Sequence, residues 1–259
     1  FAGIADNTTW NFTSADVTDP TITTLSPADN ADPVAVGSNL VITFDEIVDA
    51  VSGNITLYKT TGDVLVEAFD VTTDIDGTGT TTITCNPAAD LESETDYYVK
   101  IDAAAFDDPS DNNFAGIADN TTWNFTSADV TDPTITTLSP ADNADPVAVG
   151  SNLVITFDEI VDAVSGNITL YKTTGDVLVE AFDVTTDIDG TGTTTITCNP
   201  AADLESETDY YVKIDAAAFD DPSDNSFAGI ADNTTWNFTS ADETAPTISS
   251  VSLASDNST

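Results

Sequence analysis

Apolar and polar residues alternate with a period of two along several short segments of this chain, which is the pattern of half-buried β-strands. Leu40, Ile42 and Phe44, for example, fall on one side of such a segment. Helix-like patches at residues 87–91 and 102–106 are too short to build a layer, so the pattern predicts an all-β fold, a two-layer antiparallel β-sandwich. The predicted strands are residues 21–26, 39–45, 54–59, 64–69, 80–86, 95–102 and 122–127.

The same alternation assigns the largest side chains of these segments to the core. It places Trp123 and Phe125 on the inner face of the last strand, which argues against a sugar-binding platform. Tyr97 lies at the start of the sixth strand, where Greek-key sandwiches often carry a corner tyrosine. The Asp76-Gly77 pair predicts a hairpin turn in preference to a fragment of a calcium-binding loop.

The chain repeats itself. Residues 1–113 recur as residues 114–226 with one difference, Asn113 against Ser226. A unit of this length is too long for a solenoid repeat and suits one autonomous domain. Near-identical domains arranged as beads in an elongated array indicate length, avidity or surface coverage, and they argue against an active site assembled from specialised halves.

Acidic, proline-containing stretches at residues 16–20 and 129–133 mark the linkers between the beads. With these linkers as boundaries, the sequence begins and ends within a repeat. We therefore expect the natural protein to be longer and the end segments to be strands without a partner in this chain. The expected parts are a last strand of a preceding repeat at 1–16, complete repeats at 17–129 and 130–242, and a first strand of a following repeat at 243–259.

The chain is strongly acidic. Forty-six acidic residues against four lysines, with neither arginine nor histidine, give a formal net charge of −42. Each complete repeat carries a net charge of −19 and each end segment −2, so the acidity belongs to the repeat. Such a surface repels nucleic acid and anionic lipid and attracts cations. The absence of histidine excludes a Ser-His-Asp triad and imidazole metal sites.

The cysteines and one pair of adjacent acids are the remaining candidates for reactive groups. Each repeat has one cysteine, Cys85 or Cys198, which we expect to be a buried small hydrophobe without a disulfide partner. The adjacent acids Asp107 and Asp108 are of the type that glycosidases use. Because no aromatic cleft accompanies this pair and every repeat copies it, we expect no catalysis.

Several motifs follow one another in each repeat: Leu40-Val-Ile-Thr-Phe44, Ile83-Thr-Cys-Asn-Pro87, Tyr97-Tyr-Val-Lys-Ile101, Asn112-Asn-Phe114-Ala-Gly116 and Trp123-Asn-Phe125. In this order they resemble the bacterial Ig-like repeats of S-layer proteins and giant surface adhesins. The resemblance implies tandem Ig-like β-sandwiches that act as stalks, spacers or coats on the outside of the cell. It also implies calcium binding near the junctions, which some related adhesin repeats show.

Acidic residues gather in two loops of each predicted sandwich. The loops after the second and sixth strands should lie together at the end where the chain enters, beside the acidic linker. Calcium takes six to eight oxygen ligands and would neutralise such a cluster, stiffening the array into a rod. The alternative is a merely solvated acidic surface, as in a protein of seawater or brine. The candidate ligands are Asp19, Asp45, Glu46, Asp107, Asp108, Asp111, Asp129, Asp132, Asp158, Glu159, Asp220, Asp221 and Asp224.

Three classes of function are compatible with these features. The first is a non-catalytic spacer in a long secreted cell-surface protein, contacting chiefly the neighbouring repeats of its own chain. The second is a subunit of a multichain extracellular filament or S-layer, in which residues 1–16 complete another copy by strand addition. The third is an adhesive module that binds a ligand directly through a domain face. None of the three involves nucleic acid or insertion into a membrane.

Overall fold

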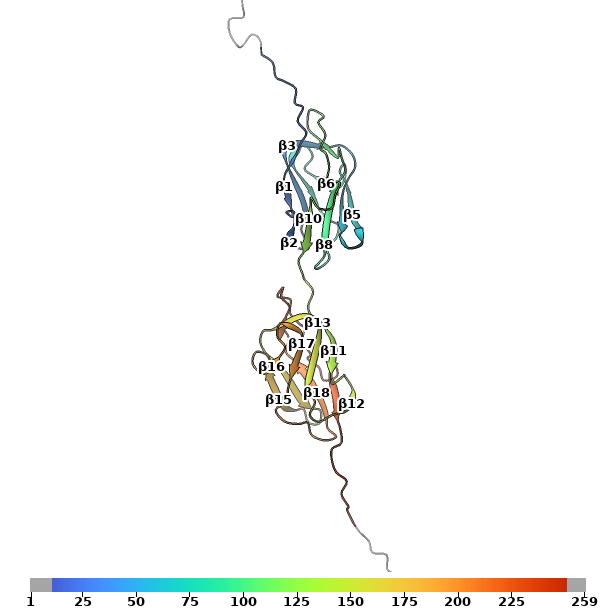
Figure 1. Ribbon diagram of the computed structural model, residues 1–259, viewed down its shortest axis with the longest axis vertical. Helices are drawn as coiled ribbons and strands as arrows, with labels where there is room; N and C mark the ends of the chain where they lie inside the picture. Colours follow the sequence, from blue (N-terminus) through green and yellow to red (C-terminus); the bar gives the residue numbers. More distant parts are fainter. Residues whose placement is uncertain (1–10, 251–259) are drawn as a thin grey trace, which may run out of the picture. The chain divides into compact units, whose positions relative to one another are not determined.

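The computed structural model describes residues 11–250, and the chain divides between Val130 and Thr131 into two units (Figure 1). The strands described in the first unit are β1 (Ile22–Ser26), β2 (Ala31–Val34), β3 (Leu40–Ala50), β4 (Asn54–Lys59), β5 (Val64–Asp70), β6 (Ile75–Asp76), β7 (Thr80–Cys85), β8 (Asp96–Ile101), β9 (Phe106–Asp107) and β10 (Asn124–Ser127). A 3-10 turn, η1 (Thr61–Asp63), joins β4 to β5.

The first unit is a sandwich of two sheets. One sheet has the order β1-β3-β7-β6, with β9 paired to the end of β3, and the other has the order β2-β10-β8-β4-β5. Neighbouring strands run antiparallel, except that β2 and β10 are parallel. The predicted all-β sandwich is therefore confirmed, and the parallel pair is an addition that the alternation did not predict.

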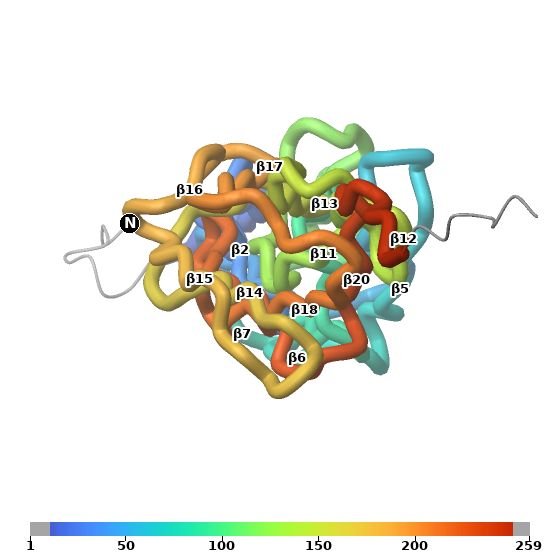
Figure 2. The backbone as a smooth tube through the Cα atoms, turned by 90° about the horizontal axis from the view of Figure 1, so that it is seen from below, coloured from blue at the N-terminus to red at the C-terminus, as the bar shows by residue number. Residues whose placement is uncertain are grey.

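The second unit has the same two sheets, in the orders β11-β13-β17-β16 and β12-β20-β18-β14-β15. Figure 2 shows β16, β17 and β13 in one row and β15, β14, β18 and β20 in another, so the two layers of this unit can be followed directly. Its strands are β11 (Ile135–Ser139), β12 (Ala144–Val147), β13 (Leu153–Ala163), β14 (Asn167–Lys172), β15 (Val177–Asp183), β16 (Ile188–Asp189), β17 (Thr193–Cys198), β18 (Asp209–Ile214), β19 (Phe219–Asp220) and β20 (Asn237–Ser240).

The core of each unit lies between the inner faces of its sheets. In the first unit Trp123 is fully buried, and its Nε1–H donates a hydrogen bond of 2.8 Å to the carbonyl oxygen of Pro27. Phe44 contacts the rings of Phe106 and Phe114, with centroids 5.5 and 5.2 Å away. Burial of such aromatic side chains is the main source of a small domain's stability. The core assignment of Trp123 and Phe125 is confirmed.

Two local predictions are also confirmed. Tyr97 is buried, and its hydroxyl oxygen accepts the backbone N–H of Glu92 at 2.8 Å, which makes it a corner tyrosine. The strands β6 and β7 form the predicted hairpin, but its turn lies after the Asp-Gly pair, over residues 77–80, where the backbone N–H of Thr80 donates to the carbonyl oxygen of Gly77 at 3.1 Å. At this turn Gly77 has a φ of 103°, and a Cβ there would lie 1.9 Å from the carbonyl oxygen of Thr82. Only glycine fits this position.

The first unit has three short strands that the alternation did not predict: β2, β6 and β9. β6 and β9 contain two residues each, and β2 contains Pro33, which cannot donate to a ladder. β3 also extends to Ala50, because its far end pairs with β9. Residues 87–91 and 102–106 contain no helix.

The described parts of the two end segments contain less regular structure than predicted. Residues 11–16 and 243–250 are exposed and contain no strand. The rest of the expected orphan strands, residues 1–10 and 251–259, lies outside the described residues. Within the described part of the chain, no helix is both long enough and apolar enough to cross a membrane.

Candidate functional site

Three carboxylates meet at the end of the first unit where the chain enters. Asp16 precedes β1, Glu46 lies in β3, and Asp108 follows β9, and one oxygen from each lies within 4.8 Å of the others. Asp108 is buried, Glu46 is half-buried and Asp16 is exposed. The pairing of Asp49 with Asp107, from β3 and β9, holds the two loops together as the sequence led us to expect.

Asp108 is held rigidly by the turn that follows it. Its Oδ1 accepts the backbone N–H groups of Ser110 and Asn112 at 2.8 and 2.7 Å, and its Oδ2 accepts the Asn112 side-chain amide at 2.9 Å. Burial alone would raise the pKa of Asp108, but these hydrogen bonds hold it below the usual value. Asp108 is therefore ionised at neutral pH. A carboxylate has about four lone-pair positions, so it retains acceptor capacity for a cation.

Glu46 experiences the opposite electrostatic effect. Loss of hydration raises its pKa, and the neighbouring carboxylates of Asp108, Asp16 and Asp45 raise it further. The charged form of Glu46 is thus disfavoured in the folded protein, and a cation placed among these carboxylates would relieve the repulsion. Calcium ligands are hard oxygens, so the chemistry of this donor set fits calcium.

A second group of acids lies beside this cluster. Burial raises the pKa of Asp107, as do the carboxylates of Asp111, Asp49 and Asp108. In the second unit the equivalent residue is Asp220, which is registered opposite Asp162. Its Oδ1 is buried and has no hydrogen-bond partner among the described residues. This unpartnered buried oxygen makes Asp220 a candidate ligand for a cation.

Other acidic residues of the predicted set have a structural role instead. Asp45 accepts the backbone N–H and the hydroxyl of Thr21 at 2.7 and 2.8 Å, which lowers its pKa. Asp158 binds Thr134 in the same way in the second unit. Both carboxylates fasten the segment before the first strand of their unit to the following long strand. These hydrogen bonds account for the presence of Asp45 and Asp158 without any role in binding a metal.

The remaining predicted residues are distributed as follows. Asp19 and Asp132 lie in exposed stretches before β1 and β11, and neither belongs to the described carboxylate cluster. Asp111 and Asp224 occupy turn positions with φ of 63° and 65°. In sequence, the equivalents of the three clustered carboxylates are Asp129, Glu159 and Asp221, of which Asp221 accepts the N–H groups of Ser223 and Asn225 at 2.8 and 2.7 Å.

Sequence reasoning omitted Asp16 from the candidate ligands. The signal was present, because Asp16 occupies the same position in its repeat as Asp129, which was included. The assignment of residues 1–16 to a preceding repeat separated Asp16 from the loops that it approaches in the structure.

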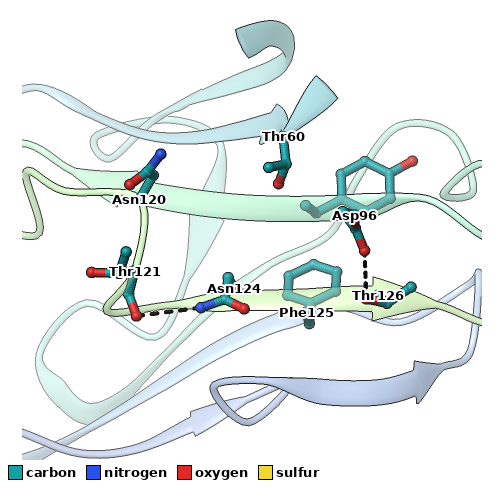
Figure 3. A pocket seen from close by; sticks show the side chains of 8 residues that line it. Thr60, Asp96, Asn120, Thr121, Asn124, Phe125 and Thr126 are labelled. Atoms are coloured by element: carbon teal, nitrogen blue, oxygen red, sulfur yellow. Dashed lines mark hydrogen bonds between the residues drawn. The ribbon is translucent and has the colours of Figure 1, made fainter. Parts of the chain in front are cut away.

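A second candidate, a hollow of about 360 Å³ on the outer side of the β10 end, offers no reactive group (Figure 3). It is lined by Thr60, Asp96, Asn120 and Thr121 together with β10 residues. The Asp96 carboxylate already accepts the hydroxyl of Thr126 at 2.6 Å, and the Asn124 amide donates to the carbonyl oxygen of Thr121. These side chains stabilise the sheet and provide no acid–base pair.

The cysteines are equally inert. Cys85 and Cys198 are fully buried and free, as expected from the alternation. Burial raises the pKa of each thiol to about 12, so the thiolate, which is the reactive form, is not populated at neutral pH.

Comparison with known proteins agrees with this architecture. The profile of the bacterial Ig-like domain matches residues 16–127 and 129–240. The chain therefore belongs to the bacterial Ig-like domain family, whose domains are non-enzymatic structural modules found usually in extracellular and surface proteins. No curated protein sequence matches.

Solved structures with a similar fold include an I-band fragment of titin, I67–I69, at 8% identity and a TM-score of 0.37, covering 87% of this chain and 66% of that one. The BSP domain of a biofilm associated protein matches at 13% identity and a TM-score of 0.23, covering 88% and 30%. Fibronectin(III)-like modules of CbhA from Clostridium thermocellum match at 14% identity and a TM-score of 0.22, covering 86% and 93%.

Proposed function

We propose that this chain is a load-bearing spacer of a long cell-surface protein. One observation carries the proposal: in each unit an N-terminal strand is paired in parallel with the last strand. In Figure 1 the chain reaches the first unit at one end of the sandwich and leaves it at the other. Tension applied at these ends first loads β1, which is paired with β3, and then pulls β2 and β10 along their own axes in opposite directions. The hydrogen bonds between them must then break together and not one after another.

The contact between β2 and β10 is reinforced by side chains. The backbone N–H of Asn30 donates to the carbonyl oxygen of Asn124 at 2.6 Å, and the N–H of Ala128 donates to Val34 at 2.7 Å. Asp29 Oδ1 accepts both the backbone N–H and the side-chain amide of Asn124 at 3.1 and 3.0 Å. We call these interactions the terminal clamp. The second unit has the same clamp, in which Asp142 accepts from Asn237.

Single-molecule pulling of the full chain tests the clamp. The variant Asp29→Ala/Asp142→Ala removes one acceptor carboxylate from each unit and should lower the unfolding force of both. The matched control is Asp70→Ala/Asp183→Ala, which removes the same charge from carboxylates that accept hydrogen bonds from a threonine two residues along the chain, Thr72 or Thr185. A clamp variant that unfolds at the same force as the control would contradict the proposal.

We further propose that calcium binds at the N-terminal end of each repeat and fixes the incoming chain to the domain. The cluster of Asp16, Glu46 and Asp108 supports this, because Asp16 comes from the linker and the other two residues come from the sandwich. Asp16 is further oriented by Thr18, which donates its N–H and hydroxyl at 3.0 and 2.6 Å. An ion held by all three would restrict rotation at the linker.

Thermal unfolding tests the calcium proposal. The melting temperature of the full chain should rise on transfer from excess chelator to calcium, and less in magnesium or in sodium chloride of matched ionic strength. Glu46→Gln/Glu159→Gln should remove most of the calcium response. In chelator at neutral pH the same variant should be more stable than the natural chain, because the raised pKa of Glu46 means that its charge opposes folding there. An equal response to all three salts would leave only general screening of an acidic surface.

A further inference from the structure

Three of the exposed large apolar side chains of the first unit are consecutive on one strand. Val64, Leu65 and Val66 open β5 and are 51%, 51% and 43% exposed. They are consecutive because Val66 is the extra residue of a β-bulge: Leu57 of β4 is registered with Glu67, and Tyr58 with Leu65. An ordinary strand would have turned one of the three towards the core. β15 has the same exposed side chains in the second unit.

β5 is also an edge of its sheet, and it is the longest edge strand of the first unit (Figure 1, cyan). Of the other edge strands, β1 contains five residues and ends before Pro27, β6 contains two residues, and β2 contains Pro33. Short length and proline are common means of preventing an edge from pairing with another chain. β5 contains seven residues without proline or lysine. The bulge at Val66 and the charge of Glu67 limit pairing in part, but β5 still has the longest proline-free backbone among the edge strands of this unit.

Fixed negative charges frame this apolar edge. Asp63 accepts the hydroxyl of Tyr98 at 3.2 Å, and Glu67 accepts the backbone N–H of Ala88 at 3.0 Å. Asp70 ends the strand. The nearest lysine, Lys59 on β4, forms an ion pair with Glu92 and so does not neutralise the edge. The edge consequently has an apolar centre between carboxylates, which defines the charge of a partner.

A second copy of this chain does not fit that charge pattern. Antiparallel pairing of two β5 strands about Leu65 would set Asp63 of one copy against Glu67 of the other. Like charges directly opposite each other destabilise a pair of strands, and each copy has a net charge of −42. A segment with lysine or arginine on both sides of apolar residues complements Asp63 on one side of Leu65 and Val66, and Glu67 and Asp70 on the other.

We propose that β5 and β15 are docking edges for an extended peptide segment of another protein, in which basic residues flank alternating apolar residues. The partner extends the sheet by main-chain hydrogen bonds, and its apolar side chains cover Leu65 and Val66. Its basic residues pair with Asp63, Glu67 and Asp70. Each repeat supplies one such edge, so a partner with several segments would bind the array with avidity.

The test uses the full chain and a fluorescent peptide of the sequence Lys-Val-Thr-Val-Thr-Val-Lys, with binding followed by anisotropy. An ionic strength of about 0.15 M limits unspecific attraction, since charges are then screened beyond about 8 Å. The edge variant Leu65→Ser/Val66→Ser/Leu178→Ser/Val179→Ser should bind at least tenfold more weakly. The control Ile47→Ser/Val51→Ser/Ile160→Ser/Val164→Ser removes as many exposed apolar side chains elsewhere and should bind within twofold of the natural chain.

Two further comparisons separate strand addition from its alternatives. A peptide of the same charge with prolines at its third and fourth positions lacks an N–H on each side of the strand and should bind at least tenfold more weakly. Equal binding of the two peptides, or of the edge and control variants, would overturn the proposal and leave only attraction between opposite charges. Sedimentation showing that the natural chain dimerises and the edge variant does not would also overturn it, in favour of a second copy.

Discussion

Removal of the Tyr97 hydroxyl provides a sharp test of the fold, because it deletes one hydrogen bond and little else. Tyr97→Phe leaves the ring in place, stacked on Phe125 with centroids 5.6 Å apart. It removes the acceptor 2.8 Å from the backbone N–H of Glu92, in a partly buried position. Loss of such a bond, with a donor left unsatisfied, costs about 1–2 kcal/mol.

This free energy can be converted into a melting temperature. An unfolding entropy of about 2.1 cal/mol/K per residue gives about 0.24 kcal/mol/K for a repeat of this size, so the transition should fall by about 4–8 °C. In differential scanning calorimetry of the full chain, the second unit serves as an internal reference, because it keeps Tyr210 and the hydrogen bond from the backbone N–H of Glu205. Tyr97→Phe should split one transition into two, with the upper one at the temperature of the natural chain.

The control for this experiment is Tyr58→Phe. The Tyr58 ring is stacked on Tyr98, and its hydroxyl has no hydrogen-bond partner among the described side chains. Its loss should change stability by less than about 0.5 kcal/mol, as for most surface changes. If the Tyr97 and Tyr58 variants melt at the same temperature, the corner hydrogen bond does not stabilise the unit and the reasoning is refuted.

Two further predictions concern single residues. Cys85 and Cys198 should resist alkylation at pH 8 in the folded chain and react fully in denaturant, because burial raises the pKa of each thiol to about 12. The extent of labelling is measured by mass spectrometry. Rapid labelling of the native protein would show that the thiols are accessible. In thermal unfolding, Gly77→Ala should destabilise the first unit more than Gly62→Ala does. A Cβ at residue 77 would meet the carbonyl oxygen of Thr82 at 1.9 Å, whereas a Cβ at residue 62 would meet only a Val64 methyl group at 3.6 Å. Equal losses of stability would contradict the turn geometry.

The fold was predictable from the sequence where one face of a strand is buried. Leu40, Ile42 and Phe44 face the core because successive side chains of a strand point to opposite faces. β6 and β9 escaped prediction because two residues show no periodicity, and β2 because Pro33 is atypical of strands. The sequence pattern did not predict the bulge at Val66 either, because the bulge depends on the register between β5 and β4.

The candidate site was only partly predictable, because aspartate serves two purposes in this protein. Asp119 accepts backbone and side-chain hydrogen bonds from Thr121 and Thr122, which lower its pKa to about 2, and it caps a turn. Asp108 has similar hydrogen bonds but approaches two other carboxylates. An acidic loop sequence looks the same in both cases, and only the fold shows which carboxylates converge.

Force-extension measurement on the natural chain, held by its two ends, tests the central claim most directly. The two repeats differ at one position, so a spacer built to carry load should give two unfolding events at the same force. Each event should release on the order of 350 Å of chain, given about 3.3–3.6 Å per extended residue. A chain that stretches smoothly, without such events above the thermal noise, would show that the terminal clamps bear no load and would contradict the account.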